Sequence, residues 1–221
     1  RHTRYPLVTG VQTCALPISA PIWLVAYVVR PNLWETDDGS PHLFRTLVMM
    51  EAQSRYPGFP RWVPDFFLGY GYPVFNYYAS MTYGVVSVMA RLGIPIYSGF
   101  EILGVLSVVG GALGVCQCVR AFWPVSSGRL GALAGVAGGL TYVAAPYPFV
   151  TNLYVRGDLP EAICLALLPW FILAIHMAFH DWSPAPRKIG LITGTIGALL
   201  LLTHSLSAVM RSEEHTSELQ S

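Results

Sequence analysis

Long apolar runs alternate with short polar segments along most of the chain. The runs cover residues 74–92, 99–119, 130–147, 162–179 and 189–209. A helix needs about 20 apolar residues to cross the hydrocarbon core of a bilayer, and most of these runs approach that length. A further apolar run at 21–29 is short and has the character of the end of another spanning helix. The pattern therefore predicts an all-α, polytopic transmembrane helical bundle with about six spanning helices.

Residues 31–72 form a long polar and aromatic segment, which we expect to be a loop outside the membrane. Within it, residues 42–55 have helical periodicity. One side of the predicted helix carries Leu43, Phe44, Leu47, Val48 and Met50. The other side carries His42, Arg45, Thr46 and Gln53. This division is typical of an amphipathic helix that lies in the membrane interface rather than crossing the bilayer.

Glycines recur at every fourth position within three of the apolar runs. They are Gly110 and Gly114, Gly131, Gly135 and Gly139, and Gly190 and Gly194. Small residues at this spacing allow two helices in lipid to approach closely. We therefore expect these positions to form packing seams between spanning helices.

Both ends of the chain resemble translated DNA-sequencing adapters. Residues 9–19 and 211–221 match opposite strands of a common adapter over their full length, and residues 1–4 resemble the flow-cell part of the same adapter. We therefore predict that residues 1–19 and 211–221 are adapter-derived scars and exclude them from the fold. The remaining part, 20–210, is predicted to be a transmembrane domain and a fragment of a longer protein.

Charged residues are few and nearly balanced. They make up 11% of the chain, and 10 basic and 9 acidic residues remain when the two ends are left out. Proteins that bind nucleic acid carry a basic patch or stripe. The composition therefore indicates the lipid bilayer as the main partner and no nucleic-acid partner.

The densest group of titratable side chains lies at residues 35–45. It contains the adjacent carboxylates Asp37 and Asp38, with His42 and Arg45 one helical turn apart. One interpretation is a functional site where a membrane helix emerges into water. The alternative is a solvated loop in which Asp38 or Ser40 caps the helix that follows.

Two further polar positions interrupt the apolar background. Residues 152–161 contain Arg156 and Glu161, and either form an ordinary connecting loop or offer a planar guanidinium to a phosphate or carboxylate. His204 lies inside the last apolar run, where an ionisable residue either lines a cavity or is a hydrogen-bonded packing residue. Three apolar runs separate residue 72 from Arg156. Counting them as crossings predicts that the Arg156 loop lies on the opposite side of the membrane from residues 31–72.

Several short motifs carry a resemblance to a known family. They are Asp38-Gly-x-x-His42-x-x-Arg45, Pro60-Arg61-Trp62, Gly69-Tyr-Gly-Tyr72-Pro-Val-Phe75, residues 153–161 and Thr203-His204-Ser205. Together they resemble the bacterial membrane proteins called pyruvoyl-tetrahydropterin-synthase-related. That family in turn looks like the GT-C membrane glycosyltransferases, which use lipid-phosphate sugar donors. The resemblance covers most of residues 22–210.

The resemblance implies a GT-C-like fold in the bacterial cytoplasmic (inner) membrane. It implies transfer of a sugar from a polyprenyl-phosphate donor to an extracytoplasmic acceptor, with Asp37 or Asp38 as the catalytic carboxylate. The candidates for binding the substrate or its phosphate are His42, Arg45, Arg61, Tyr72, Arg156, Glu161 and His204. A divalent metal held by Asp38 and His42 is compatible with this activity but not required by it.

A different class of function also fits the apolar pattern. The chain can be a transporter or another non-catalytic polytopic membrane protein. Transporters place ionisable groups near the middle of the bilayer on broken helices. Here most charges lie between the apolar runs, and only Glu101 and His204 lie within them. This distribution favours chemistry at the membrane surface.

Overall fold

The computed structural model describes residues 36–56, 58, 60–78, 80–122, 129–179 and 186–204. Its helices are α2 (Gly39–Arg55), α3 (Val74–Tyr77), α4 (Met81–Arg91), α5 (Ile96–Phe122), α6 (Arg129–Ala144), the π-helix η2 (Pro146–Arg156), α7 (Leu159–Phe179) and α8 (Pro186–Thr203). An isolated antiparallel bridge joins Val63 to Tyr72. This part of the chain is helical, as the apolar pattern predicts. The run at 21–29 and both predicted adapter segments lie outside it.

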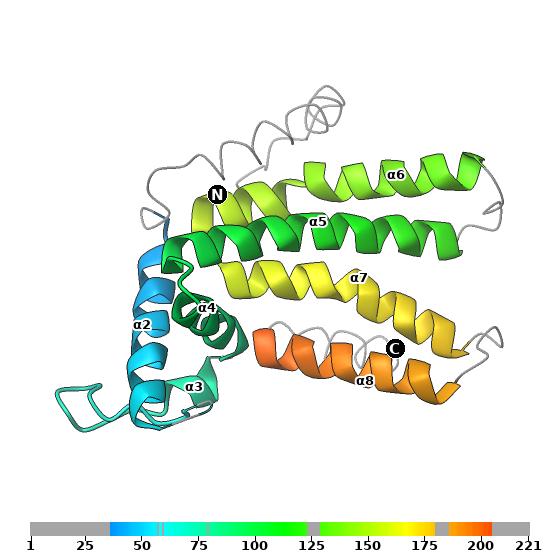
Figure 1. Cartoon of the computed structure of the whole chain (residues 1–221). Helices are drawn as coiled ribbons and strands as arrows, with labels where there is room; N and C mark the ends of the chain where they lie inside the picture. The colour runs from blue at the N-terminus through cyan, green and yellow to red at the C-terminus, as the bar shows by residue number, and fades with distance from the viewer. Residues whose placement is uncertain are drawn as a thin grey trace, which may run out of the picture.

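Four long rods, α5, α6 with η2, α7 and α8, lie side by side, and α2 crosses one end of them (Figure 1). Three helical stretches in the described ranges are long and apolar enough to cross a membrane: Ile96–Phe122, Arg129–Arg156 and Leu159–Phe179. Phe100, Phe149, Leu153 and Leu159 are buried in the core cluster between them. The total of about six spanning helices stays a prediction.

The apolar run at 74–92 is not one spanning helix, and that prediction is wrong. It forms the four-residue α3 and the 11-residue α4. At 1.5 Å per residue, α4 is only about 16 Å long and cannot cross a bilayer. The helix stops at Tyr78, whose backbone is extended. The Tyr78 ring lies under the Arg45 guanidinium, 3.9 Å from its Cζ, so a side-chain contact accompanies the break.

The run at 130–147 continues further than its hydrophobicity suggests. Helix α6 ends at Ala144, Ala145 is extended, and Pro146 starts η2, which runs on to Arg156. Residues 152–156 are therefore helical, and the prediction of a connecting loop there is wrong. Proline favours the first position of a helix because its missing N–H needs no partner there. The polar residues of this last turn thus belong to the end of a spanning rod.

The Arg156 turn lies beside the start of α2. The backbone N–H of Asp38 donates to the carbonyl oxygen of Arg156 at 2.7 Å. The prediction that these segments lie on opposite sides of the membrane is therefore wrong. With α4 too short to cross, two rods separate residue 72 from Arg156 instead of three, and an even number of crossings returns the chain to the same side.

This arrangement predicts a specific labelling pattern. In a chain whose native cysteines are replaced by alanine, Asp37→Cys and Val155→Cys should react with a membrane-impermeant maleimide from the same side. Both positions are exposed at the α2 end of the bundle. Arg129→Cys, at the far end of α6, should react only from the other side. Labelling of positions 37 and 155 from opposite faces would contradict the topology.

Helix α2 is present as predicted, but its polar side is buried against the protein and its apolar side is largely exposed. The buried positions are Gly39, His42, Thr46, Met49 and Ala52. On the predicted apolar side, Phe44 is 54% and Leu47 is 46% exposed. The His42 ring on the polar side has a partner in the protein, Tyr83, and the Thr46 hydroxyl is satisfied within α2 itself by the His42 carbonyl oxygen.

The α6 glycines form a seam against α5, as predicted. Gly131, Gly135 and Gly139 are all buried. A Cβ at Gly139 would lie 2.9 Å from the Ala112 carbonyl oxygen, so only glycine permits this approach. By contrast, a Cβ at Gly190 or Gly194 would meet nothing within 4 Å among the described residues. For that pair the predicted seam stays a prediction.

Candidate functional site

The candidate site lies where α2, α4, the end of η2, the start of α7 and the end of α8 meet (Figure 1). Gly157 ends η2 in a left-handed conformation, with φ of +73°. A Cβ there would collide with the Thr36 side chain. Glycine therefore serves two purposes: it allows the sharp turn into α7 and lets residues 36–38 lie directly against that turn.

Arg156 is the centre of the polar network in this turn. Its Nη2 lies 3.3 Å from Asp38 Oδ2 and 3.1 Å from Asp158 Oδ2. Its Nη1 lies 2.9 Å from Glu161 Oε2 and donates to Asn152 Oδ1 at 3.1 Å. A planar guanidinium can serve several acceptors at once in this way. Arg156 therefore holds three carboxylates around one charge: Asp38 from the start of α2, and Asp158 and Glu161 from its own turn into α7.

Asp38 occupies the N-cap position of α2, but its side chain makes no capping hydrogen bond. Its half-buried carboxylate instead contacts Arg156. The capping interpretation of this residue is therefore wrong. Asp37 is exposed. The two adjacent carboxylates thus differ in environment, and Asp38 is the one held in a fixed position.

Asp158 is the most deeply buried carboxylate of the network, with 6% of its surface exposed. Burial by itself would raise its pKa, but the neighbouring His42 imidazole and the Glu161 backbone N–H outweigh this effect. The nearby His204 acts in the same direction, and the pKa of Asp158 is lowered overall. His42 Nε2 is 3.6 Å from Asp158 Oδ1. The network thus keeps a buried negative charge ionised.

A second chain of contacts leads from Asp158 to Arg45. His42 Nδ1 is 2.9 Å from Tyr83 Oη, and Arg45 Nη1 is 3.4 Å from both of these atoms. Burial raises the pKa of Tyr83 to about 12, so its phenol stays protonated at neutral pH. These contacts hold Arg45 at the edge of the site, with its guanidinium over the ring of Tyr78.

The candidate metal pair, Asp38 and His42, is directed elsewhere. Asp38 faces Arg156, while the two ring nitrogens of His42 face Tyr83 and Asp158. No group of three or more His, Cys, Asp or Glu side chains with the geometry of a metal site occurs in the described ranges. The arrangement around these two residues does not fit a metal.

The remaining predicted site residues are placed differently from one another. Glu161 belongs to the Arg156 network and also accepts a hydrogen bond from Tyr147 at 2.8 Å. His204 follows α8 and contributes to the lowered pKa of Asp158. Tyr72 lines a pocket next to Arg45, whereas Arg61 is exposed and does not line that pocket. Sequence reasoning missed Tyr83, Tyr147, Asn152 and Asp158 as site residues.

Two open cavities border the site. A pocket of about 300 Å³ is lined by Pro41, Phe44, Arg45, Phe66, Phe67, Tyr72, Val74 and Tyr78. A mostly apolar groove of about 200 Å³ runs between α4, α5 and α7, and its lining includes Met81, Leu106 and Trp170. The first cavity combines aromatic rings with a cation, and the second has the character of a lipid-binding groove.

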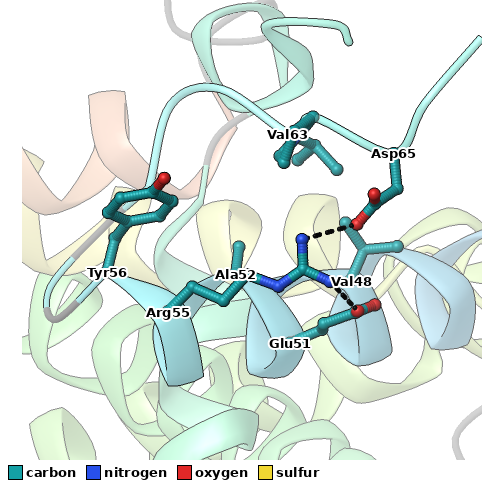
Figure 2. Close-up of a pocket in the computed structure, with 8 residues that line it drawn as sticks. Val48, Glu51, Ala52, Arg55, Tyr56, Val63 and Asp65 are labelled. Atoms are coloured by element: carbon teal, nitrogen blue, oxygen red, sulfur yellow. Dashed lines mark hydrogen bonds and ion pairs between the residues drawn. The ribbon is translucent and has the colours of Figure 1, made fainter. Parts of the chain in front are cut away.

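A third cavity, at the other end of α2, has a structural role. Arg55 lies between Glu51 at 2.9 Å and Asp65 at 3.1 Å, and so ties the segment that follows α2 to the helix (Figure 2). The cavity measures only about 10 Å³, which is too small for an organic ligand. Arg55 therefore joins two segments of the chain and, unlike Arg45, lines a cavity that is too small for a ligand.

The lowered pKa of Asp158 predicts how stability depends on pH. Its charge should stabilise the fold fully above the unfolded carboxyl pKa of about 3.9, and this contribution should be lost as pH falls through the lower folded value. Thermal unfolding between about pH 2 and pH 7 should therefore show a loss of stability below about pH 4 that is smaller in Asp158→Asn. Identical acid dependence in the two proteins would contradict the assignment.

A family of membrane proteins, described as 6-pyruvoyl-tetrahydropterin synthase related, matches residues 75–214. The match includes Tyr83 and the whole Arg156 turn, and it begins after Asp38 and Arg45. It also extends four residues into the predicted adapter segment at 211–221, whose origin remains a prediction. No curated protein and no solved structure matches the chain.

Proposed function

The chain belongs to the 6-pyruvoyl-tetrahydropterin synthase related family of membrane proteins, and we propose that it is a GT-C-like glycosyltransferase. In this proposal it transfers a sugar from a polyprenyl-phosphate donor to an acceptor outside the bacterial cytoplasmic membrane. The observation that carries the proposal is the half-exposed Asp38 carboxylate, which Arg156 holds at the α2 end of the bundle. An enzyme of this class needs such a fixed, accessible base.

Asp38 is the proposed general base. A sugar hydroxyl is a weak nucleophile, and a carboxylate within hydrogen-bond reach can accept its proton as the oxygen attacks the anomeric carbon. The bond between the anomeric carbon and the phosphate oxygen then breaks, and the lipid phosphate leaves with the electron pair. The contact with Arg156 holds the Asp38 carboxylate in one orientation, since a charge-assisted hydrogen bond to a guanidinium fixes the direction of its acceptor.

The arginines have different proposed roles. Arg156 already contacts Asp38, Asp158 and Glu161, so we assign it the role of a positioning residue. The charge that stabilises the leaving phosphate is instead assigned to Arg45. His42 and Tyr83 support Arg45 from behind through the contacts described above.

The polyprenyl tail is proposed to occupy the groove between α4, α5 and α7. This groove is lined mainly by apolar side chains, including Val85, Leu103 and Ile163. Met81, at the start of α4, lies in the same groove and is contacted by Thr203 from the end of α8. The groove thus extends to the end of the bundle where the candidate site lies.

The test is transfer of a labelled sugar from a polyprenyl-phosphate donor by the purified full chain. The proposal predicts a labelled product that depends on Asp38. Transport, the alternative, predicts accumulation of substrate in sealed vesicles without any new glycosidic bond. No observation on the described residues favours transport over transfer.

A further inference from the structure

The pocket next to Arg45 has the size and lining of a ligand site. Its volume of about 300 Å³ lies at the lower end of the range found for small-molecule sites. Five of its eight lining residues are aromatic: Phe44, Phe66, Phe67, Tyr72 and Tyr78. Arg45 supplies its positive charge. A small ring-shaped molecule with an anionic group is the ligand chemistry that such a lining would recognise.

Arg45 differs from Arg156 and Arg55 in having no acidic partner among the residues that the structure describes. Arg156 contacts three carboxylates and Arg55 contacts two. In the part of the chain that the structure describes, the ion pairs do not include Arg45. A half-buried cation without a counter-charge is costly. An anionic ligand would supply the missing partner.

The guanidinium of Arg45 has N–H groups that can donate hydrogen bonds to such a ligand. Its contacts with His42 and Tyr83 both use Nη1, and its guanidinium lies over the Tyr78 ring. Within the described residues, Nη2 and Nε then remain as donors on a residue that lines the pocket. Two parallel N–H groups of a guanidinium match the two oxygens of a phosphate or carboxylate.

The aromatic rings form a wall with a defined geometry. Phe44 meets Phe66 edge to face, with ring centroids 5.5 Å apart, and Phe67 meets Tyr72 in the same way at 5.0 Å. Phe67 has a φ of +52°, which bulky residues rarely adopt. Rings held in this way offer flat apolar faces, on which the C–H groups of a sugar ring can pack while its hydroxyls stay in water.

The proposed base lies on the same side of α2 as two residues that line the pocket. Asp38, Pro41 and Arg45 follow the spacing i, i+3 and i+7, which places them along one stripe of the helix. The rise from residue 38 to residue 45 is about 10 Å. The backbone of the proposed base thus lies about two helical turns from the backbone of Arg45.

We infer that this pocket binds a monosaccharide that carries an oxyanion, with the ring against the aromatic wall and the oxyanion on Arg45. The inference deepens the proposed function, on which it rests for its biological meaning, by assigning the sugar to a specific pocket. The oxyanion has two candidate sources: the phosphate of a glycosyl phosphate or the carboxylate of a uronic acid. Both present the same pair of oxygens to the guanidinium.

The test is direct binding to the purified full chain in detergent, measured by calorimetry and by saturation-transfer NMR. The probes are glucose 1-phosphate, glucuronate, glucose and inorganic phosphate. We expect at least one of the two anionic sugars to bind about tenfold or more tightly than glucose and than inorganic phosphate. A preference for glucose 1-phosphate identifies a glycosyl phosphate, and a preference for glucuronate identifies an acidic sugar.

Two variants test the two halves of the pocket. Arg45→Gln should weaken binding of the preferred probe about 10- to 100-fold, and Phe44→Ala should weaken it several-fold and reduce saturation transfer to the ring protons. Phe44 is more than half exposed, so its truncation should leave the fold intact. Arg55→Gln, on the same helix as Arg45, and Tyr70→Ala, an aromatic residue near Phe67 and Tyr72 in sequence, are the matched controls. Both positions lie outside the pocket, so these variants should bind the probe normally.

Several outcomes would overturn the inference. Glucose binding as tightly as the anionic sugars would show that Arg45 does not select an oxyanion. Inorganic phosphate binding equally well, with no effect of Phe44→Ala, would show that the aromatic wall takes no part. Normal probe binding and normal sugar transfer by Arg45→Gln would refute both the pocket and the role assigned to Arg45 at the leaving phosphate. Transfer that still depended on Asp38 would nevertheless keep the glycosyltransferase proposal. Binding as expected without any transfer would refute the proposed function and keep the pocket.

Discussion

Replacing Asp38 with asparagine is expected to lower sugar transfer by about 10²–10⁴-fold, the usual contribution of a general base. Asparagine keeps the size of aspartate but cannot accept a proton at neutral pH. Stability should change little, because the ion pair between Asp38 and Arg156 is partly exposed and such pairs contribute at most about 1 kcal/mol. The measurement is the initial rate of labelled-sugar transfer, with melting temperature as a check on folding.

Asp37→Asn is the matched control for this prediction. It removes a carboxylate at the neighbouring position, but Asp37 is exposed and Asp38 is the one held by Arg156. We therefore expect Asp37→Asn to keep near-normal transfer, and the double variant to behave like Asp38→Asn alone. If Asp37→Asn abolishes transfer while Asp38→Asn does not, the base has been assigned to the wrong residue. If the double variant stays active, neither carboxylate is the base.

Replacing Arg156 with methionine should be the most damaging substitution for stability at the site. It would leave Asp38, Asp158 and Glu161 close together without the charge that holds them. Removing one partner of a buried ion pair typically costs about 3–5 kcal/mol. The Arg156 side chain is 35% exposed, so solvent screening reduces the expected loss to about 2–3 kcal/mol. This corresponds to a fall in melting temperature of roughly 5–10 °C.

Arg55→Met provides the comparison for Arg156→Met. Arg55 also contacts two carboxylates, but its side chain is 48% exposed on the surface of α2. Exposed pairs contribute little, so we expect a loss of less than about 1 kcal/mol. Arg156→Lys should fall between the two, since it keeps the charge and loses the planar fork. Equal losses for Arg156→Met and Arg55→Met would show that the Arg156 network does not stabilise the turn.

The apolar pattern predicted the long helices well because lipid-crossing helices depend on length and hydrophobicity. Helices α5 and α7 lie close to the predicted runs. The pattern failed at residues 74–92 because hydrophobicity does not show that the backbone at Tyr78 is extended. It failed at 152–156 because the polar residues there are satisfied inside a helical turn, through contacts such as that between Arg156 and Asn152.

The sequence located part of the site but not its connections. The motifs pointed to Asp38, Arg156 and Glu161, which the fold brings together around one guanidinium. Tyr83 was missed because it lies in an apolar run that resembled a spanning helix. The orientation of α2 was also missed. A pattern of apolar and polar positions cannot show that His42 contacts Tyr83 or that the Thr46 hydroxyl bonds to its own helix backbone, so their side of the helix was expected to be the exposed one.

The most direct test of the proposed function compares transfer and uptake in the same preparation. The full chain would be reconstituted into sealed liposomes with a polyprenyl-phosphate donor that carries a radiolabelled sugar and a mixture of candidate acceptor glycans. The proposal predicts that the label moves from the lipid to a water-soluble or acceptor-linked product, and that Asp38→Asn prevents this. Intact labelled donor, together with uptake of a separately added free sugar that carries a second label, would contradict the assignment as a glycosyltransferase.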